Sequence, residues 1–154
     1  MRTARFYGRA GYTLVELAVV IMMLSIVTVL SYYKLQPALE HGKVNSAAAV
    51  MAADLQYAQI IAARQRKPVV VIATVATQSY VIRDRASATT VFRTRYLGSG
   101  TDYALDELSG SPSTTIQVFA TGVTPTTTTF TLGLNGYKRL VKFSKAGQIR
   151  IIKY

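Results

Sequence analysis

Gly11-Tyr12-Thr13-Leu14-Val15-Glu16 begins an almost uninterrupted apolar run that continues to Leu30. From Tyr12 to Leu30 the run is 19 residues long, about the length that spans a lipid bilayer. Glu16 is the one carboxylate within it. An ionised side chain inside a membrane costs about 2.5–3.5 kcal/mol on insertion scales, so such a residue indicates a function.

A basic segment without acidic residues precedes the run, from Met1 to Gly11. Its charged residues are Arg2, Arg5 and Arg9. An ordinary secretory signal has a shorter apolar core and a small-residue cleavage site directly after it. Here Ser-Tyr-Tyr-Lys follows the run, and no A-x-A pattern lies nearby. A plain single-span anchor fits the length, but neither alternative accounts for Glu16.

The pattern resembles the class III signal of type IV prepilins and of the pseudopilins of type II secretion. In that family a prepilin peptidase cuts after the Gly of a basic leader, the new N-terminus is N-methylated, and the fifth mature residue is Glu. The resemblance implies cleavage between Gly11 and Tyr12 and methylation of Tyr12, although Phe is commoner than Tyr at this position. It also implies that Glu16 pairs with the α-amine of Tyr12 of a neighbouring filament subunit.

The composition of the chain limits the classes of protein to which it can belong. The chain has 154 residues and a net charge of +11, and it contains no cysteine, which excludes a disulfide scaffold and thiol-ligated metal sites. Loss of the three leader arginines leaves 15 basic and 7 acidic residues, a net charge of +8. This excess favours anionic partners such as nucleic acid or lipid headgroups.

The sequence divides into four segments. We expect a cleaved leader over 1–11, a transmembrane and filament-core helix over 12–33, an amphipathic second half of that helix over 34–67, and a β-rich domain over 68–154. Because basic flanks stay in the cytoplasm, the β-rich domain should lie on the outer, periplasmic side of the inner membrane.

The second half of the helix carries one apolar stripe. Its members recur at spacings of three and four residues, and they are Val44, Ala48, Met51, Leu55, Ala58 and Ala62. We place Asn45, Asp54, Gln59 and Arg66 off this stripe. Pro37 and Gly42 predict a kink or a short melted segment near 35–42. The helix should stop at Lys67, before Pro68.

Beyond Pro68 the periodicity is that of β-strands. The predicted strands cover 69–73, 79–85, 90–96, 115–120, 128–134, 138–144 and 148–153, and the stretch 97–113 is predicted to be rich in turns. Asn135-Gly136 is a strong hairpin signal. We therefore expect an α+β, pilin-like fold: a long N-terminal hydrophobic helix packed on a C-terminal antiparallel β domain, built as a small sandwich or a pair of sheets.

The end of the chain narrows the resemblance to the GspH/FimT group. Phe143-Ser144-Lys145-Ala146-Gly147-Gln148-Ile149-Arg150-Ile151 is similar to the last hairpin of that group, whereas 97–114 is unmatched. Some FimT-type pilins bind DNA through a Gly-Arg-x-Arg motif in this hairpin. The corresponding residues here are Gly147-Gln148-Ile149-Arg150, so only Arg150 carries over. The resulting candidates for DNA binding are Lys142, Lys145, Gly147, Arg150 and Lys153, and the alternative is a solvated basic face that protects a strand edge.

Two further groups of charged residues need an interpretation. Arg83, Arg85, Arg93 and Arg95 alternate on neighbouring strands, and we expect them on one exposed face. Asp102, Asp106 and Glu107 lack the regular ligand spacing of a Ca²⁺ loop. With one His, no Cys and no phosphate-binding loop, the sequence predicts no enzyme, no metal, no cofactor and no small-molecule substrate.

Three functions remain open. The first is a minor pseudopilin of a type II secretion system, a structural subunit of the periplasmic pseudopilus. The second is a FimT-type minor type IV pilin that binds or takes up DNA, and the third is a plain membrane-anchored β domain. The expected partners are prepilin peptidase, other pilins or pseudopilins, the inner membrane and, for the second function, DNA.

Overall fold

The computed structural model describes residues 11–154, so the predicted leader arginines lie outside the described residues. The chain forms two compact units, Met1–Pro37 and Ala38–Tyr154. One helix, α1 (Leu14–Gln65), runs through both of them. Each unit is described by itself below.

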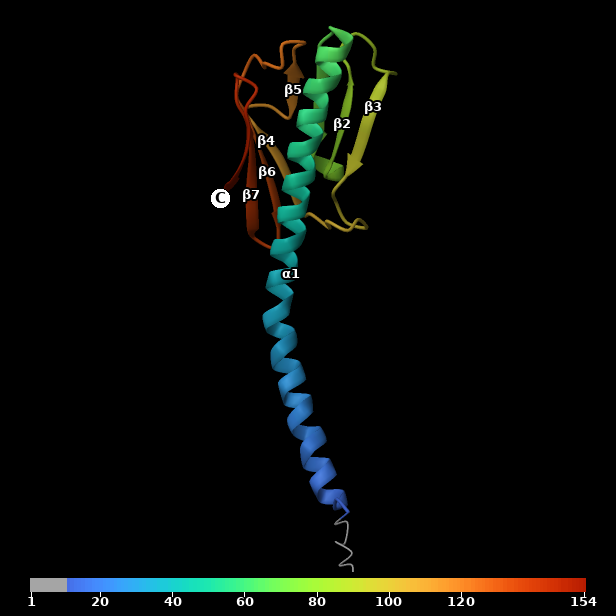
Figure 1. Ribbon diagram of the computed structural model, residues 1–154, viewed down its shortest axis with the longest axis vertical. Helices are drawn as coiled ribbons and strands as arrows, with labels where there is room; N and C mark the ends of the chain where they lie inside the picture. Colours follow the sequence, from blue (N-terminus) through green and yellow to red (C-terminus); the bar gives the residue numbers. More distant parts are fainter. Residues whose placement is uncertain (1–10) are drawn as a thin grey trace, which may run out of the picture. The chain divides into compact units, whose positions relative to one another are not determined.

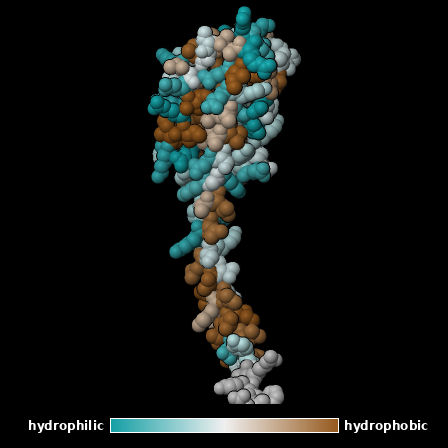
Figure 2. Space-filling view, in the orientation of Figure 1, coloured by the Kyte–Doolittle hydropathy of each residue, from teal (hydrophilic) through white to brown (hydrophobic). Residues whose placement is uncertain are grey.

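The first unit is an apolar helix with no protein packed against it. From 11 to 37 every side chain is exposed, and α1 is the one helix within the described residues that is long and apolar enough to cross a membrane. Figure 2 shows hydrophobic residues gathered along this part of the chain. The hydroxyls of Ser25, Thr28 and Ser31 each donate a 2.8 Å hydrogen bond to the carbonyl four residues earlier. Their polar atoms are therefore satisfied inside the helix, as a lipid environment requires.

α1 stays helical through Pro37 and Gly42. The melted segment that the sequence predicted near 35–42 is therefore wrong. Proline removes only one backbone donor from a helix, and the residues on both sides keep the helical conformation. The helix ends at Gln65, two residues before the predicted Lys67, and Arg66 adopts a left-handed conformation with φ 52°.

In the second unit α1 buries one face against two antiparallel sheets (Figure 1). All six residues of the predicted stripe are buried, which confirms the stripe, and Ala47 joins them. The first sheet has the order β3-β2-β1-β5, and the second has the order β4-β6-β7-β8. The strands are β1 (Val69–Thr74), β2 (Ser79–Asp84), β3 (Val91–Tyr96), β4 (Glu107–Ser111), β5 (Thr115–Val118), β6 (Thr128–Leu134), β7 (Tyr137–Phe143) and β8 (Ile149–Lys153), with a 3₁₀ turn at Val75–Thr77.

β4 lies within 97–113, the turn-rich stretch in which the sequence predicted no strand. It pairs with β6 over five residues and contributes buried Leu108 to the core. Its other residues are Glu, Ser, Gly and Ser, which carry no strand signal. Gly110 is needed here because a Cβ atom would lie 2.7 Å from the Ser113 carbonyl oxygen.

The predicted hairpin at Asn135-Gly136 is confirmed. Both residues have positive φ, 50° and 86°, and they join β6 to β7 in register. The side chain of Asn135 fixes the turn to the start of the second unit, because its Nδ2 donates to Glu40 Oε1 at 2.8 Å. The backbone N–H of Asn135 donates to Asp106 at 2.8 Å. This defines one end of the unit, where α1 begins its packing on the sheets.

Candidate functional site

The predicted processing and assembly residues lie at the start of α1. Gly11 and Tyr12 precede the helix and are exposed. Thr13 caps it, because the Glu16 amide donates to Thr13 Oγ1 at 3.2 Å. Glu16 is in the first turn, where a carboxylate is favoured by the helix dipole. The sequence Thr13-Leu14-Val15-Glu16 has the spacing of a capping box, of which the bond from the Glu16 backbone N–H to Thr13 Oγ1 is formed.

A buried ionic cluster joins α1 to the first sheet. Asp54 is 2% exposed. Its carboxylate accepts hydrogen bonds from the hydroxyl of Tyr80 at 2.7 Å, from Nε of Arg95 at 3.1 Å, and from Arg93. The Arg93 guanidinium also lies 4.2 Å from the centre of the Tyr57 ring. One carboxylate on the helix thus holds one residue of β2 and two of β3.

These contacts fix the charge of the cluster. Burial by itself would raise the pKa of Asp54, but the hydrogen bonds from Arg95, Tyr80 and Arg93 outweigh it and hold that pKa below its ordinary value. Burial, together with the hydrogen bond to Asp54, strongly raises the pKa of Tyr80. The hydrogen bond to Asp54 raises the pKa of Arg95. Asp54 is therefore ionised and Tyr80 is neutral throughout the physiological range.

This cluster corrects two predictions. Asp54 lies on the buried stripe and not off it, and the spacing Ala47, Met51, Asp54, Ala58 already carried that signal. The four arginines do not share one exposed face. Arg93 and Arg95 pair across the sheet with Ile82 and Tyr80, which are buried, whereas Arg83 comes one residue after Ile82 and points to the other face.

The last hairpin depends on Gly147. Its φ is 82°, and a Cβ atom would lie 2.6 Å from the Gly122 carbonyl oxygen. Gln59 on α1 donates to the carbonyls of both Gly122 and Gly147, at 2.9 and 2.8 Å. The turn from Ser144 to Gln148 is thereby fixed to the helix. The positive φ and the close approach of the Gly122 carbonyl oxygen therefore explain why the glycine of the family motif, Gly147, is needed at this position.

The structure brings together only some of the DNA-binding candidates. Lys142 and Arg150 are cross-strand partners on β7 and β8. Together with Ser144, Gln148 and Ile152 they line an open cavity of about 230 Å³. Lys145 is exposed in the adjoining turn. Lys153 pairs with Arg139 near the other end of β8 and faces the opposite side of the sheet, so it does not join this group.

The acidic residues near β4 have other partners. Asp106 accepts the Asn135 amide, and Glu107 forms a 2.6 Å ion pair with Lys138. Across residues 11–154 no three His, Asp or Glu side chains are arranged to hold a metal ion. His41 stacks on Tyr137 with 3.8 Å between the ring centres, and Arg139 donates to Asn45 at 2.7 Å. These residues connect α1 to β7.

Solved structures share this fold. The type IV minor pilin FimU of Pseudomonas aeruginosa strain PAO1 is 24% identical, with a TM-score of 0.61, and the match covers 73% of this chain and 90% of FimU. A second crystal form of FimU matches at 25% identity, a TM-score of 0.57, and coverage of 70% and 91%. The minor pseudopilin EpsH of the type 2 secretion system of Vibrio cholerae is 15% identical, with a TM-score of 0.58 and coverage of 72% and 97%.

The sequence itself identifies the family. No curated protein sequence matches the chain. Residues 47–147, which make up more than half of the chain, match the family described as type II transport protein GspH. The matched range includes the Asp54 cluster, both sheets up to β7, and Gly147. The protein therefore belongs to the GspH family and has the pilin-like fold that its N-terminal motif indicated.

Proposed function

We propose that the protein is a minor pseudopilin, a structural subunit of the periplasmic pseudopilus of a type II secretion system. The observation that carries this proposal is the match of residues 47–147 to type II transport protein GspH. It is supported by an exposed apolar helix whose capped first turn contains a single carboxylate. Pilins and pseudopilins assemble into filaments, which would cover such a helix.

In this proposal the helix has two successive environments. Residues 12–33 first hold the subunit in the inner membrane with the β domain in the periplasm. Prepilin peptidase cuts between Gly11 and Tyr12, and Tyr12 is N-methylated. In the filament, Glu16 pairs with the α-amine of Tyr12 of a neighbouring subunit. Because both charges would otherwise be unpaired in an apolar core, the pair sets the register between subunits.

Deletion of the gene distinguishes a subunit of a type II secretion pseudopilus from a subunit of a type IV pilus. The proposal predicts that secreted folded proteins accumulate in the periplasm of the deletion strain, while the number of surface pili does not change. Re-expression of the wild-type chain should restore secretion. Normal secretion combined with loss of pili would contradict the proposal and would favour a minor type IV pilin.

A FimT-type minor type IV pilin that binds DNA is the second candidate, and the pair Lys142 and Arg150 favours it. The two cations lie side by side on an open face, with the side chains of Ser144 and Gln148 next to them. For this function Arg150→Ala should weaken the binding of duplex DNA and reduce its salt dependence by about one phosphate contact. Unchanged DNA binding in Arg150→Ala would show that this hairpin is not the DNA-binding site.

A further inference from the structure

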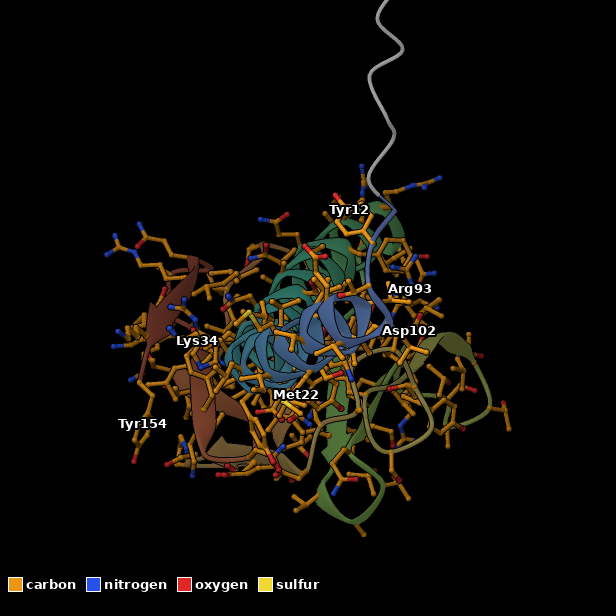
Figure 3. All side chains as sticks on the ribbon, turned by 90° about the horizontal axis from the view of Figure 1, so that it is seen from below. Tyr12, Met22, Lys34, Arg93, Asp102 and Tyr154 are labelled. Atoms are coloured by element: carbon orange, nitrogen blue, oxygen red, sulfur yellow. The ribbon has the colours of Figure 1, made fainter. Side chains whose placement is uncertain are left out.

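β8 forms an open edge of the second sheet, because β7 is its one neighbour there. Natural edge strands are commonly protected by a bulge, a proline or charged side chains. β8 pairs with β7 without a register shift, contains no proline, and has two cations, Arg150 and Lys153. It also exposes an isoleucine on each side of the sheet, since Ile151 is 46% and Ile152 40% exposed. Figure 3 shows Tyr154, which directly follows the strand, pointing away from the rest of the domain.

The other edge strands of the two sheets are less suited to pairing. The register between β3 and β2 shifts between Ile82 and Arg83, and β5 has four residues. β4 is in contact with β1 of the first sheet. β8 is therefore the most regular open edge of the domain.

The hydrogen bonds of the last hairpin show which backbone groups of β8 are free. The Ser144 N–H donates to the Gln148 carbonyl at 2.9 Å, so these two residues form a hydrogen-bonded pair. Hydrogen-bonded and non-hydrogen-bonded pairs alternate along two antiparallel strands. Every second residue of β8 therefore turns its N–H and C=O groups to the open edge, and these residues are Ile149, Ile151 and Lys153. Within residues 11–154 no hydrogen bond from another element reaches the backbone of β8.

The hairpin that carries this edge is fixed to the rest of the domain. Gln59 of α1 donates to the carbonyls of Gly122 and Gly147, and the Lys145 amide donates to Thr127 Oγ1 at 3.2 Å. A partner strand would therefore meet an edge that is already ordered, which lowers the entropic cost of binding.

The charge along the edge indicates the kind of partner. Residues 137–154 contain six cations and no acid. Among the described residues, the ion pair of this tract is that of Lys138 with Glu107. A second copy of β8 would add cations to a cationic edge, and like charges on neighbouring strands are unfavourable. An acidic strand would be attracted to the same edge.

We propose that β8 binds an extended acidic segment of another protein, which joins the second sheet as an antiparallel strand. Hydrogen bonds to the free backbone groups of β8 provide affinity, and the side chains provide specificity. Arg150 and Ile152 line the open cavity of about 230 Å³ together with Lys142. An acid beside Arg150 and an apolar residue beside Ile152 would fill this cavity. With a second acid beside Lys153, the partner sequence reads acid, apolar, apolar, acid, apolar.

This interaction goes beyond the proposed function as a filament subunit. β8 lies outside residues 47–147, which carry the family match. The DNA candidate depends on the side chains of Lys142 and Arg150, whereas strand addition depends on the backbone of β8. Secretion measures the proposed function and peptide affinity measures strand addition, so the two proposals fail separately.

The test measures the anisotropy of fluorescein-labelled peptides added to the full chain in nonionic detergent micelles. The acidic probe is Thr-Glu-Val-Val-Glu-Val-Thr, which places its glutamates beside Lys153 and Arg150 in an antiparallel strand. The swapped probe has lysine in place of the glutamate beside Arg150. The wild-type chain should bind the acidic probe about fivefold more tightly than the swapped probe.

N-methylated acidic probes test the backbone contact on the wild-type chain. N-methylation of the valine opposite Ile151 removes an N–H that donates to β8 and should weaken binding about tenfold. The valine opposite Ile152 turns its N–H away from β8, so its N-methylation is the matched control and should change the affinity little.

Two variants test the same contact from the side of the protein. Ile151→Pro removes an N–H that faces the open edge and no bond to β7, a position where strands tolerate proline. It should weaken binding of the acidic probe about tenfold, whereas Ile151→Val should bind like the wild type. Arg150→Glu should reverse the preference in favour of the swapped probe, a gain of binding that misfolding cannot imitate.

Several results would overturn the proposal. These are equal weakening by the two N-methylations, wild-type affinity in folded Ile151→Pro, and an unreversed preference in Arg150→Glu. Self-association that Ile151→Pro abolishes, without binding of the acidic probe, would overturn it by showing that a second copy covers the edge. Binding of duplex DNA without binding of the acidic probe would also contradict it.

Discussion

Asp54→Asn should destabilise the β domain by about 2–4 kcal/mol, the largest effect on stability that we expect from a single polar side chain. The substitution leaves Arg93 and Arg95 without their buried partner. Removal of one member of a fully buried pair costs about 3–5 kcal/mol. The side chains of Arg93 and Arg95 are 37% and 34% exposed, so water screens part of the loss. Urea unfolding of the full chain in micelles, followed by tyrosine near-ultraviolet circular dichroism, measures the difference.

Low pH should imitate this substitution in the wild-type protein. Because the pKa of Asp54 is lowered in the folded state, its contribution to stability is fully present above the ordinary value of 3.8. The contribution is lost as the pH falls through the lower folded-state pKa. The stability difference between wild type and Asp54→Asn should therefore shrink as the pH is lowered below the ordinary pKa of 3.8.

Two controls distinguish the stability effect of losing the buried Asp54 carboxylate from the effect of losing any negative charge. Asp102→Asn removes an exposed acid and should change the free energy of unfolding by less than about 0.5 kcal/mol. Replacement of Asp54, Tyr80, Arg93 and Arg95 together by Leu, Phe, Met and Met should recover most of the loss, because apolar residues can substitute for a buried ionic cluster when no polar partner is left unpaired. Equal effects of Asp54→Asn and Asp102→Asn would show that the cluster contributes little.

Glu16→Ala should lower incorporation of the subunit into filaments by about 100-fold or more, the largest functional effect that we expect. In the proposed pairing, loss of the carboxylate would leave the α-amine of Tyr12 unpaired in the apolar filament core. Membrane insertion and leader cleavage should continue, because the substitution makes the helix more apolar. The measurement is the fraction of the subunit that is recovered in sheared, pelleted filaments relative to the membrane fraction.

Thr13→Ala separates pairing from helix capping. It removes the Oγ1 atom that accepts the Glu16 amide but keeps the carboxylate. Loss of a cap costs about 1 kcal/mol, which a long helix in a membrane or filament tolerates. Incorporation should therefore be close to normal in Thr13→Ala. Equal losses in Thr13→Ala and Glu16→Ala would mean that Glu16 acts only as part of the helix cap.

The parts of the fold that local pattern determines could be predicted from the sequence. The buried stripe of α1 follows from spacings of three and four residues, and the hairpin at Asn135-Gly136 follows from its need for positive φ at both positions. A charge within an apolar run and the family resemblance indicate Gly11, Tyr12 and Glu16, whose roles in processing and assembly stay predictions. In each case the signal lies within a few residues along the chain.

The remaining features depend on contacts between distant residues. β4 has one large apolar residue, Leu108, and becomes a strand because β6 provides its partner. Asp54 is 39 residues from Arg93 and 41 from Arg95, and no local pattern predicts that they meet. Arg93 and Arg95 lie on the opposite side of the sheet from Arg83. Which side each arginine takes depends on the register between β2 and β3, and this register shifts between Ile82 and Arg83.

The intact mass of the protein purified from its own bacterial membranes tests the central claim most directly. We predict a chain that begins at Tyr12 and is one methyl group heavier than the sequence from Tyr12 to Tyr154. Gly11→Leu should leave the unprocessed precursor, 11 residues longer, because the residue before the cleavage site has to be small. A wild-type protein that retains Met1 to Gly11, or that is cut after Leu30, would contradict the claim that this chain is a prepilin-like filament subunit.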